Sequence, residues 1–327
     1  MLRRLWSRET LSGEDRISVN DAFAIATTLT DAVQMKMTSD NTLDQTPRRG
    51  RILRLLRRLL ASVVLVGAGI ACTVYFHPTA RFVRHVEAME GQVVSEYVGP
   101  HWLGQLVDKK KLTMFHRIEL ISLWTPAVTD EGLSGLNRHD EITQLYLNCA
   151  QIGDSGLCRL DRLPNLEHLD VRNTQIGDDS LKGLSRFPRL NSLYIGETRV
   201  TDEGLAHLRE VPQLEYLDLE NAAVTDAGIR EIEQLINLKH LCLIRTKVTD
   251  DGLAHLRPLT RLMTLDLGSM VVTDAGLPHL KHLISLKVLR IKGTPVTAAG
   301  IADLKAALPN LEVSAGEPWV CQFCLAR

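Results

Sequence analysis

The stretch LNSLYIGETRVTDEGLAHLREVPQ, from Leu190 to Gln213, decides the fold of this chain. Blocks with the same pattern recur every 24 residues. They begin at Ile118, Ile142, Leu166, Leu190, Leu214, Leu238, Leu262 and Leu286. We assign the repeat array to 118–313, as eight 24-residue units of which the last is extended. One unit cannot bury its own leucines, so the units are expected to stack on one another.

Each block combines a strand pattern with a helix pattern. Positions 1, 4 and 6 are apolar, as in Leu190, Leu193 and Ile195, which predicts a strand with one buried face. Position 13 is usually Asp, and a Gly and two leucines three residues apart follow it, which predicts a short helix. We interpret the Asp column, from Asp130 to Asp274, as caps for the N-termini of these helices. A ladder of cation sites is the less favoured interpretation of that column.

Stacked units of this kind predict an α/β solenoid, coiled in the right-handed sense. The strands are expected to join in one parallel sheet, with neighbours about 4.8 Å apart. The short helices lie outside the sheet. Because helices are thicker than strands, the stack should curve, with the sheet on its concave face.

The blocks, written LxxLxLxxTxVTDxGLxxL, resemble leucine-rich repeats, whose units have about 20–29 residues. Their VTDxGL segment is similar to the cysteine-containing subclass found in F-box substrate receptors. Together with an apolar N-terminal segment and the motif GPHWL at 99–103, the array resembles bacterial membrane-anchored leucine-rich-repeat proteins. The resemblance implies a non-enzymatic scaffold that binds a protein partner. Two alternatives stay open, a self-assembling envelope protein and an F-box-like adaptor, although no F-box-like segment is expected before the array.

An apolar segment at 59–76, LLASVVLVGAGIACTVYF, predicts one transmembrane helix close to the minimum length of about 20 residues. Residues 1–58 form a polar, partly disordered tail that ends in an arginine cluster. Arginines before a span stay in the cytoplasm, which places the repeats on the other side of the membrane. A cleaved signal peptide, a lipoprotein site at Cys72 and a buried core helix are the alternatives to an uncleaved anchor.

Residues 77–117 are expected to cap the first repeat. Arg81–Glu90 has helical character, Gly91 ends it, and Gln92–Val98 alternates like a strand. The amphipathic segment PHWLGQLVD, 100–108, places Trp102 where it could cover the exposed end of the core.

Positions 3, 5 and 7 should point out of the concave face, where side chains are not needed for packing. Tyr, Trp and Arg are frequent at binding hot spots, so a partner-binding patch is predicted there. Solvated strand residues with high β-propensity are the alternative interpretation. The candidate partner-binding residues are Trp124, Tyr146, His168, Asp170, Arg172, Tyr194, Tyr216, Asp218, Glu220 and His240.

Catalytic, metal and cofactor sites are not expected. His168, Asp170 and Glu220 come from different coils on an open surface, whereas a catalytic pKa shift needs a desolvated cleft. The balance of 38 basic and 39 acidic residues indicates neither a nucleic-acid surface nor a charged small-molecule substrate. In the tail at 314–327, Cys321 and Cys324 form at most half of a zinc site. A local disulfide or a frayed terminus are the other interpretations of that pair.

Overall fold

The structure is a computed structural model, and it describes residues 78–98, 116–125, 128–148 and 151–315. From Phe82 onward these residues form one compact unit. The predicted span at 59–76, the Trp102 segment and the Cys321–Cys324 pair lie outside the described residues. Within the described ranges, none of the helices combines the length and the apolarity that crossing a bilayer requires.

One sheet runs through the unit, and its described strands follow chain order. Its first pair is antiparallel, with β1 (Gln92–Tyr97) against β2 (His116–Ser122). Each later pair is parallel and joins equal positions of neighbouring blocks, as in Leu193 opposite Leu217, so the predicted parallel sheet is confirmed. The other strands are β3 (Gln144–Tyr146), β4 (His168–Asp170), β5 (Ser192–Tyr194), β6 (Tyr216–Asp218), β7 (His240–Cys242), β8 (Thr264–Asp266), β9 (Val288–Arg290) and β10 (Glu312–Ser314).

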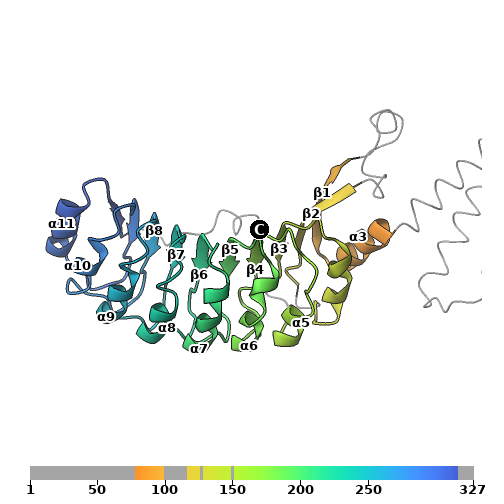
Figure 1. Ribbon diagram of the computed structural model, residues 1–327, viewed down its shortest axis with the longest axis horizontal. Coiled ribbons are helices and arrows are strands. Elements are labelled where there is room, and N and C mark those ends of the chain that lie inside the picture. Colours follow the sequence, from red (N-terminus) through yellow and green to blue (C-terminus); the bar gives the residue numbers. More distant parts are fainter. Residues whose placement is uncertain (1–77, 99–115, 126–127, 149–150, 316–327) are drawn as a thin grey trace, which may run out of the picture. The chain divides into compact units, whose positions relative to one another are not determined.

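Short helices line the other side of the repeats. Figure 1 shows the strands along the inner side of a shallow arc and the helices along its outer side. The α-helices are α5 (Asp154–Cys158), α6 (Asp178–Leu181), α7 (Asp202–Leu205), α8 (Asp226–Glu231), α9 (Asp250–Leu253), α10 (Leu277–Leu280) and α11 (Ala298–Ala307). The 3₁₀-helices are η5 (Gly132–Arg138), η6 (Leu184–Arg186), η7 (Ala206–Glu210) and η8 (Ala254–Leu256).

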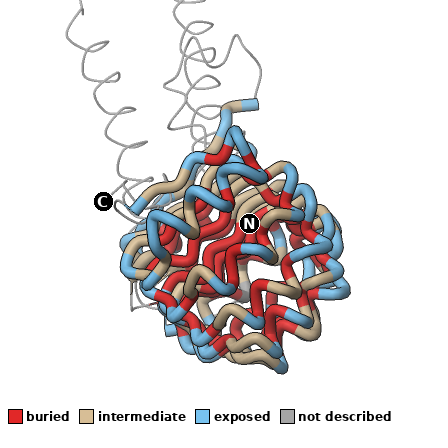
Figure 2. The backbone as a smooth tube through the Cα atoms, turned by 90° about the vertical axis from the view of Figure 1, so that its left-hand side faces the viewer, coloured by how far each residue is buried: buried red, intermediate tan, exposed pale blue. Residues whose placement is uncertain are grey.

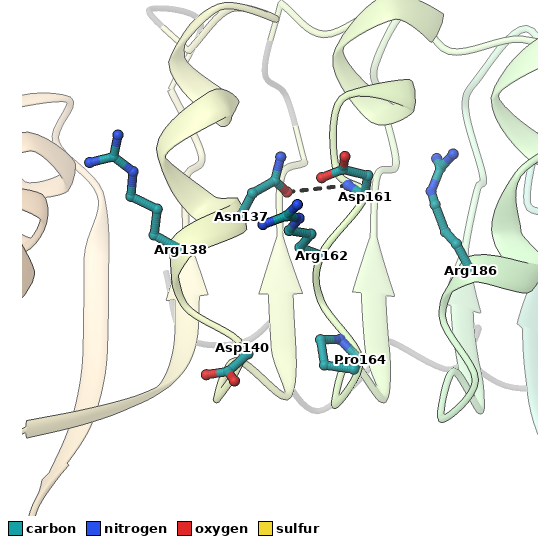
Figure 3. Close-up of a pocket in the computed structure, with 7 residues that line it drawn as sticks. All are labelled: Asn137, Arg138, Asp140, Asp161, Arg162, Pro164 and Arg186. Atoms are coloured by element: carbon teal, nitrogen blue, oxygen red, sulfur yellow. Dashed lines mark hydrogen bonds between the residues drawn. The ribbon is translucent and has the colours of Figure 1, made fainter.

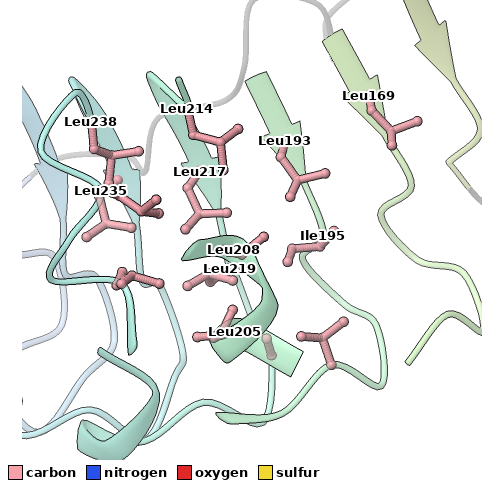
Figure 4. Close-up of a cluster of buried hydrophobic side chains, with 14 of the residues drawn as sticks. Leu169, Leu193, Ile195, Leu205, Leu208, Leu214, Leu217, Leu219, Leu235 and Leu238 are labelled. Carbon is pink, nitrogen blue, oxygen red and sulfur yellow. The ribbon is translucent and has the colours of Figure 1, made fainter. Parts of the chain in front are cut away.

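The core lies between the strands and the helices and is continuous from coil to coil. Figure 2 shows buried backbone segments gathered in the interior of the coils. Leu193 and Ile195 enter the core from the strand side, and Leu205 and Leu208 from the helix side (Figure 4). All four are fully buried. Burying one such side chain contributes roughly 1.5–3 kcal/mol. A helix of four residues, such as α7, is not stable alone, so this burial holds it in place.

The first coil is covered by α3 (Pro78–Ala88) and β1. Phe82 and Val86 of α3 are buried in the same core as the leucines, and Val93 of β1 packs against it. The helix begins three residues before the predicted Arg81, and the strand expected over Gln92–Val98 is confirmed. Gly91 is required at the turn, because a Cβ there would lie 2.8 Å from Val86 Cγ1.

The aspartates at position 13 do not cap their own helices, contrary to the sequence prediction. Asp202 is the first residue of α7, and its carboxylate accepts hydrogen bonds from the next coil, from Thr225 N at 2.8 Å and Thr225 Oγ1 at 2.6 Å. The threonine at position 12 is the N-cap residue instead, as Thr201 accepts from Glu203 N. A carboxylate oriented toward the neighbouring coil satisfies the first amide of that coil's helix, a partner that the pattern of a single block does not reveal.

The same inter-coil bond recurs along the array and forms what we call the aspartate ladder. Its members are Asp130, Asp154, Asp178, Asp202, Asp226, Asp250 and Asp274, each accepting from the backbone N–H 23 residues later. Position 15 is Gly in most blocks because the ladder aspartate of the preceding coil occupies the space where a side chain would lie. A Cβ at Gly228, for example, would overlap Asp202 Oδ1. Ser180 stands at this position in one block, and its hydroxyl donates to Asp154. The ladder ends where Ala298 replaces the aspartate.

Candidate functional site

The candidate residues lie on one surface, which we call the strand face: the side chains at positions 3, 5 and 7 of each block. Strand pairing places Asp170 beside Tyr194, Tyr194 beside Asp218, and Tyr216 beside His240. Three-residue strands hold these side chains at fixed spacing because every neighbour is hydrogen-bonded in register.

Arg172 joins three coils at the centre of the strand face. Its guanidinium makes two hydrogen bonds to Asp170, Nε to Oδ1 at 3.0 Å and Nη2 to Oδ2 at 2.6 Å. It also lies 3.7 Å from Asp218, two coils away, and 5.2 Å above the Tyr194 ring. Position 7 of the intervening coil is Gly196, where a Cβ would lie 2.9 Å from Glu220 O. The charge of Arg172 is thus largely neutralised within the protein.

Aromatic rings continue the row from Tyr194. The rings of Tyr194 and Tyr216 stack with centroids 4.5 Å apart, and the His240 ring follows at 5.7 Å from Tyr216. Tyr194 and Tyr216 are only 6% and 9% exposed. The premise that strand-face side chains are not needed for packing is therefore wrong for these residues, and so is the alternative that they are simply solvated.

Asp170 and Asp218 have a structural role that the sequence interpretation missed. Each accepts a hydrogen bond from the backbone N–H two residues later, at 3.1 Å and 2.9 Å. Asp266, not among the predicted residues, does the same toward Gly268 at 3.1 Å. An aspartate at the last strand position, in every second coil from β4 to β8, is the signal that could have indicated these turns.

Burial shifts the ionisation of several residues on the strand face. It raises the pKa of Asp218 and also that of Glu220, to which Asp218 and Glu197 add repulsion. It lowers the pKa values of His168 and His240. Burial also raises the pKa of the Cys242 thiol well above its ordinary value, so the reactive thiolate form is suppressed.

The remaining predicted residues lie on the same face but in other places. Tyr146 is nearly buried and donates to Gln144 Oε1 at 3.1 Å. Trp124 is half-buried in the first coil. Glu220 pairs with Arg245 at 3.5 Å, an arginine that the sequence interpretation did not include. Ile244, at position 7 of the next block, is buried and was also missed.

Three residues after the end of each strand from β4 to β9, one residue adopts the left-handed backbone conformation. These residues occupy position 8 of successive blocks: Asn173, Glu197, Asn221, Arg245, Ser269 and Gly293, with φ between 52° and 74°. Asn and Gly accept this conformation readily, whereas Glu197 and Arg245 do so at a cost of roughly 1 kcal/mol. Two residues that form the edge of the strand face, Glu197 and Arg245, are therefore held in fixed, exposed positions.

A shallow cavity of about 630 Å³ lies away from the strand face, on the loops that precede β3 and β4 (Figure 3). Asn137 closes part of it by bonding the next coil, donating to Arg159 O at 2.6 Å and accepting from Asp161 N at 3.2 Å. Arg186 donates to Leu157 O at 2.9 Å. The residues that line the cavity are Asn137, Arg138, Asp140, Asp161, Arg162, Pro164 and Arg186.

Within the described residues, no group of three His, Cys, Asp or Glu side chains is placed to hold a metal ion. The strand face brings together stacked rings, a neutralised arginine and carboxylates with raised pKa values. Such a surface can hold a polypeptide by stacking and by charge-assisted hydrogen bonds.

Comparison with known proteins agrees with the repeat pattern. A family model described as a leucine-rich repeat matches residues 162–185. The chain is similar in structure to internalin C2 of Listeria monocytogenes (25% identity, TM-score 0.47), over 60% of this chain and 80% of that one. It is also similar to a leucine-rich-repeat protein of Leptospira interrogans (18% identity, TM-score 0.46), over 63% of this chain and 50% of that one. No curated protein sequence matches. The matched residues span the length of one 24-residue unit, and the structure repeats the same coil of one strand and one short helix along the array.

Proposed function

We propose that the chain is a non-enzymatic scaffold that recognises a protein partner through its strand face. The observation that carries the proposal is the row Arg172, Tyr194, Tyr216 and His240, which packs across four coils. Its side chains are ordered before any partner arrives, which reduces the entropy cost of association. Tyr and Arg at such positions are frequent binding anchors.

We also propose that 59–76 anchors the chain in a membrane, with the N-terminus in the cytoplasm and the repeats on the other side. The support for this part is the uncharged apolar run and the arginines that precede it. Protease added to intact cells should cleave the repeats if this topology holds. Full-length chain recovered from the soluble fraction would refute the anchor.

Site-specific photocrosslinking tests the binding face. A photoreactive residue placed at Glu197 on the edge of the strand face should capture a discrete partner in native membranes. The same residue at exposed Gln234, on the helix side, is the matched control and should not. Capture of a second copy of the chain would support self-assembly, and equal capture from both positions would refute the assignment.

A further inference from the structure

Charge is segregated along the strand face, and this order specifies the chemistry of the partner. We count the strand face together with its two rims, position 2 where the strands begin and position 8 where they end. The coils of β4 to β6 present six carboxylates and one guanidinium: Glu167, Asp170, Glu197, Glu215, Asp218, Glu220 and Arg172. The coils of β7 to β9 present five cations and one carboxylate: Lys239, Arg245, Lys287, Arg290, Lys292 and Asp266.

The sign changes between β6 and β7, and it does so on both rims. Lys239 pairs with Glu215 at 2.7 Å on the rim where the strands begin. Arg245 pairs with Glu220 at 3.5 Å on the rim where they end. These pairs cross the boundary. Farther from it, Glu167 and Glu197 lie in the acidic half and Lys287 and Lys292 in the basic half, where Asp266 lies opposite Arg290. Arg172 is bound by the buried Asp170 and Asp218, so these three charges largely compensate one another inside the protein.

The charged residues around His168 and His240 also differ between the acidic and the basic half. Burial is the main reason that the pKa values of His168 and His240 are lowered. Beyond burial, Glu167 acts to raise the pKa of His168. At His240, Lys239 and Arg290 act to lower the pKa, whereas Glu215 across the boundary acts to raise it. Glu220, in the acidic half, has its pKa raised further by Asp218 and Glu197.

The centres of the two halves lie three coils apart, which at about 4.8 Å per coil is roughly 14 Å. This distance exceeds the Debye length of about 8 Å at physiological ionic strength, so charges at the centre of one half are largely screened from those at the centre of the other. The stacked rings of Tyr194, Tyr216 and His240 lie across the boundary between the halves. The strand face therefore offers an acidic surface, a ring platform and a basic surface in fixed order.

We propose that the partner of the strand face is a polypeptide segment that carries separate blocks of opposite charge. Its cationic block lies over the coils of β4 to β6 and its anionic block over those of β7 to β9. An aromatic or apolar side chain between the blocks rests on the ring of His240, which is partly exposed. This proposal rests on the proposed function, since it assigns the chemistry of that same face. Complementary fields of this kind fix register and exclude partners with the wrong order of charge.

Two peptides of equal composition test the order of charge. The block peptide Ac-KKKKGYGEEEE-NH2 and the alternating peptide Ac-KEKEGYGKEKE-NH2 have the same net charge. Fluorescence anisotropy with the full chain in nonionic detergent should show at least about tenfold tighter binding of the block peptide at low salt, with the preference shrinking at 0.5 M salt. Equal affinity for the two peptides would overturn the proposal.

Charge reversal separates this effect from a loss of folding. Glu197→Lys with Glu220→Lys lowers the formal charge of the acidic half from -5 to -1 and should strongly weaken the preference for the block peptide. Adding Lys239→Glu and Arg245→Glu lowers the charge of the basic half from +4 to 0, and the preference should then be lost. Unchanged preference in either variant, when thermal melting shows both folded, would refute the proposal.

Crosslinking tests in which direction the block peptide lies along the strand face. A benzophenone on the lysine end should label 167–220, and one on the glutamate end should label 239–292; the reverse assignment would overturn the proposal. If the photocrosslinker at Glu197 captures a protein partner while the peptides bind equally, the scaffold function stands and only the charge order fails.

Discussion

At the scale of single residues, Arg172 shows how a binding candidate can also be a structural residue. Replacing it with Met keeps most of the side-chain volume but leaves Asp170 and Asp218, which are 2% and 4% exposed, without their cation. Breaking a buried pair by removing one partner costs roughly 3–5 kcal/mol. Urea denaturation of Arg172→Met should show a loss of this size. Arg199→Met, at an exposed arginine that bonds Gln175, should change stability by less than about 0.5 kcal/mol.

The two half-buried histidines predict how stability depends on pH. The pKa values of His168 and His240 are lowered in the folded chain, so the unfolded chain, at about 6.5, binds protons more readily. Their contribution is fully present above about pH 6.5 and is lost as pH falls through the folded pKa values. The melting temperature should therefore fall between pH 7.5 and pH 5.5.

The double variant His168→Gln and His240→Gln should lose part of that pH dependence. The raised pKa values of Asp218 and Glu220 act in the opposite sense, since their destabilising effect is relieved as pH falls. Acidification should therefore destabilise the double variant less than the wild type. His282→Gln, at an exposed histidine, serves as the control. A double variant with the wild-type pH profile would contradict this assignment.

At the scale of the elements, the aspartate ladder couples neighbouring coils through one side chain and one glycine. Asp202→Ala leaves the amide and hydroxyl of Thr225 without their acceptor, which should cost about 1–3 kcal/mol. Gly228→Ala should also destabilise, because its Cβ would overlap Asp202. In the Asp202→Ala background, the same glycine substitution should cost less.

A double-mutant cycle by chemical denaturation measures this coupling, with an expected size of about 0.5–3 kcal/mol. In the Asp202→Ala background, Gly228→Ala should still cost some stability, because the new Cβ would also lie 2.9 Å from Val224 Cγ1. Asp179→Ala, at an exposed aspartate outside the ladder, is the control. Additive effects of Asp202→Ala and Gly228→Ala would show that the ladder does not set the glycine requirement.

The periodic pattern predicts the elements well because each apolar column repeats. Leu193 and Leu217 must face one core, and a strand of period two is the simplest arrangement that allows it. The hydrogen bonds of the aspartate ladder could not be predicted in this way. Asp202 accepts from Thr225 in the next coil, whereas helix-propensity rules describe one helix at a time. The residues with left-handed backbone conformation are also only partly predictable. Asn173 and Asn221 are of a type that favours this conformation, whereas Glu197 and Arg245 adopt it only because the coil imposes it.

At the scale of the whole array, the sequence predicts which residues share the strand face but not how they pack. Positions 3, 5 and 7 identify Tyr194, Tyr216 and His240 as neighbours. The bridge from Arg172 to Asp218 spans two coils, a relation across 46 residues that no single block contains. Tertiary context therefore made a packed surface of residues that the sequence interpretation treated as not needed for packing.

The cap at the start of the array predicts how the molecule unfolds. A solenoid opens from an end where its core is uncovered, because each coil contacts only its neighbours. Val86→Asp places a carboxylate in the core beneath α3, where Val86 is fully buried. Hydrogen–deuterium exchange should accelerate in β2 and β3 and stay close to wild type in β7 and β8. Glu87→Ala, at an exposed position of the same helix, should leave both regions protected. Uniform loss of protection across the sheet would instead mean that the array unfolds as one cooperative unit, and that α3 stabilises all of it equally.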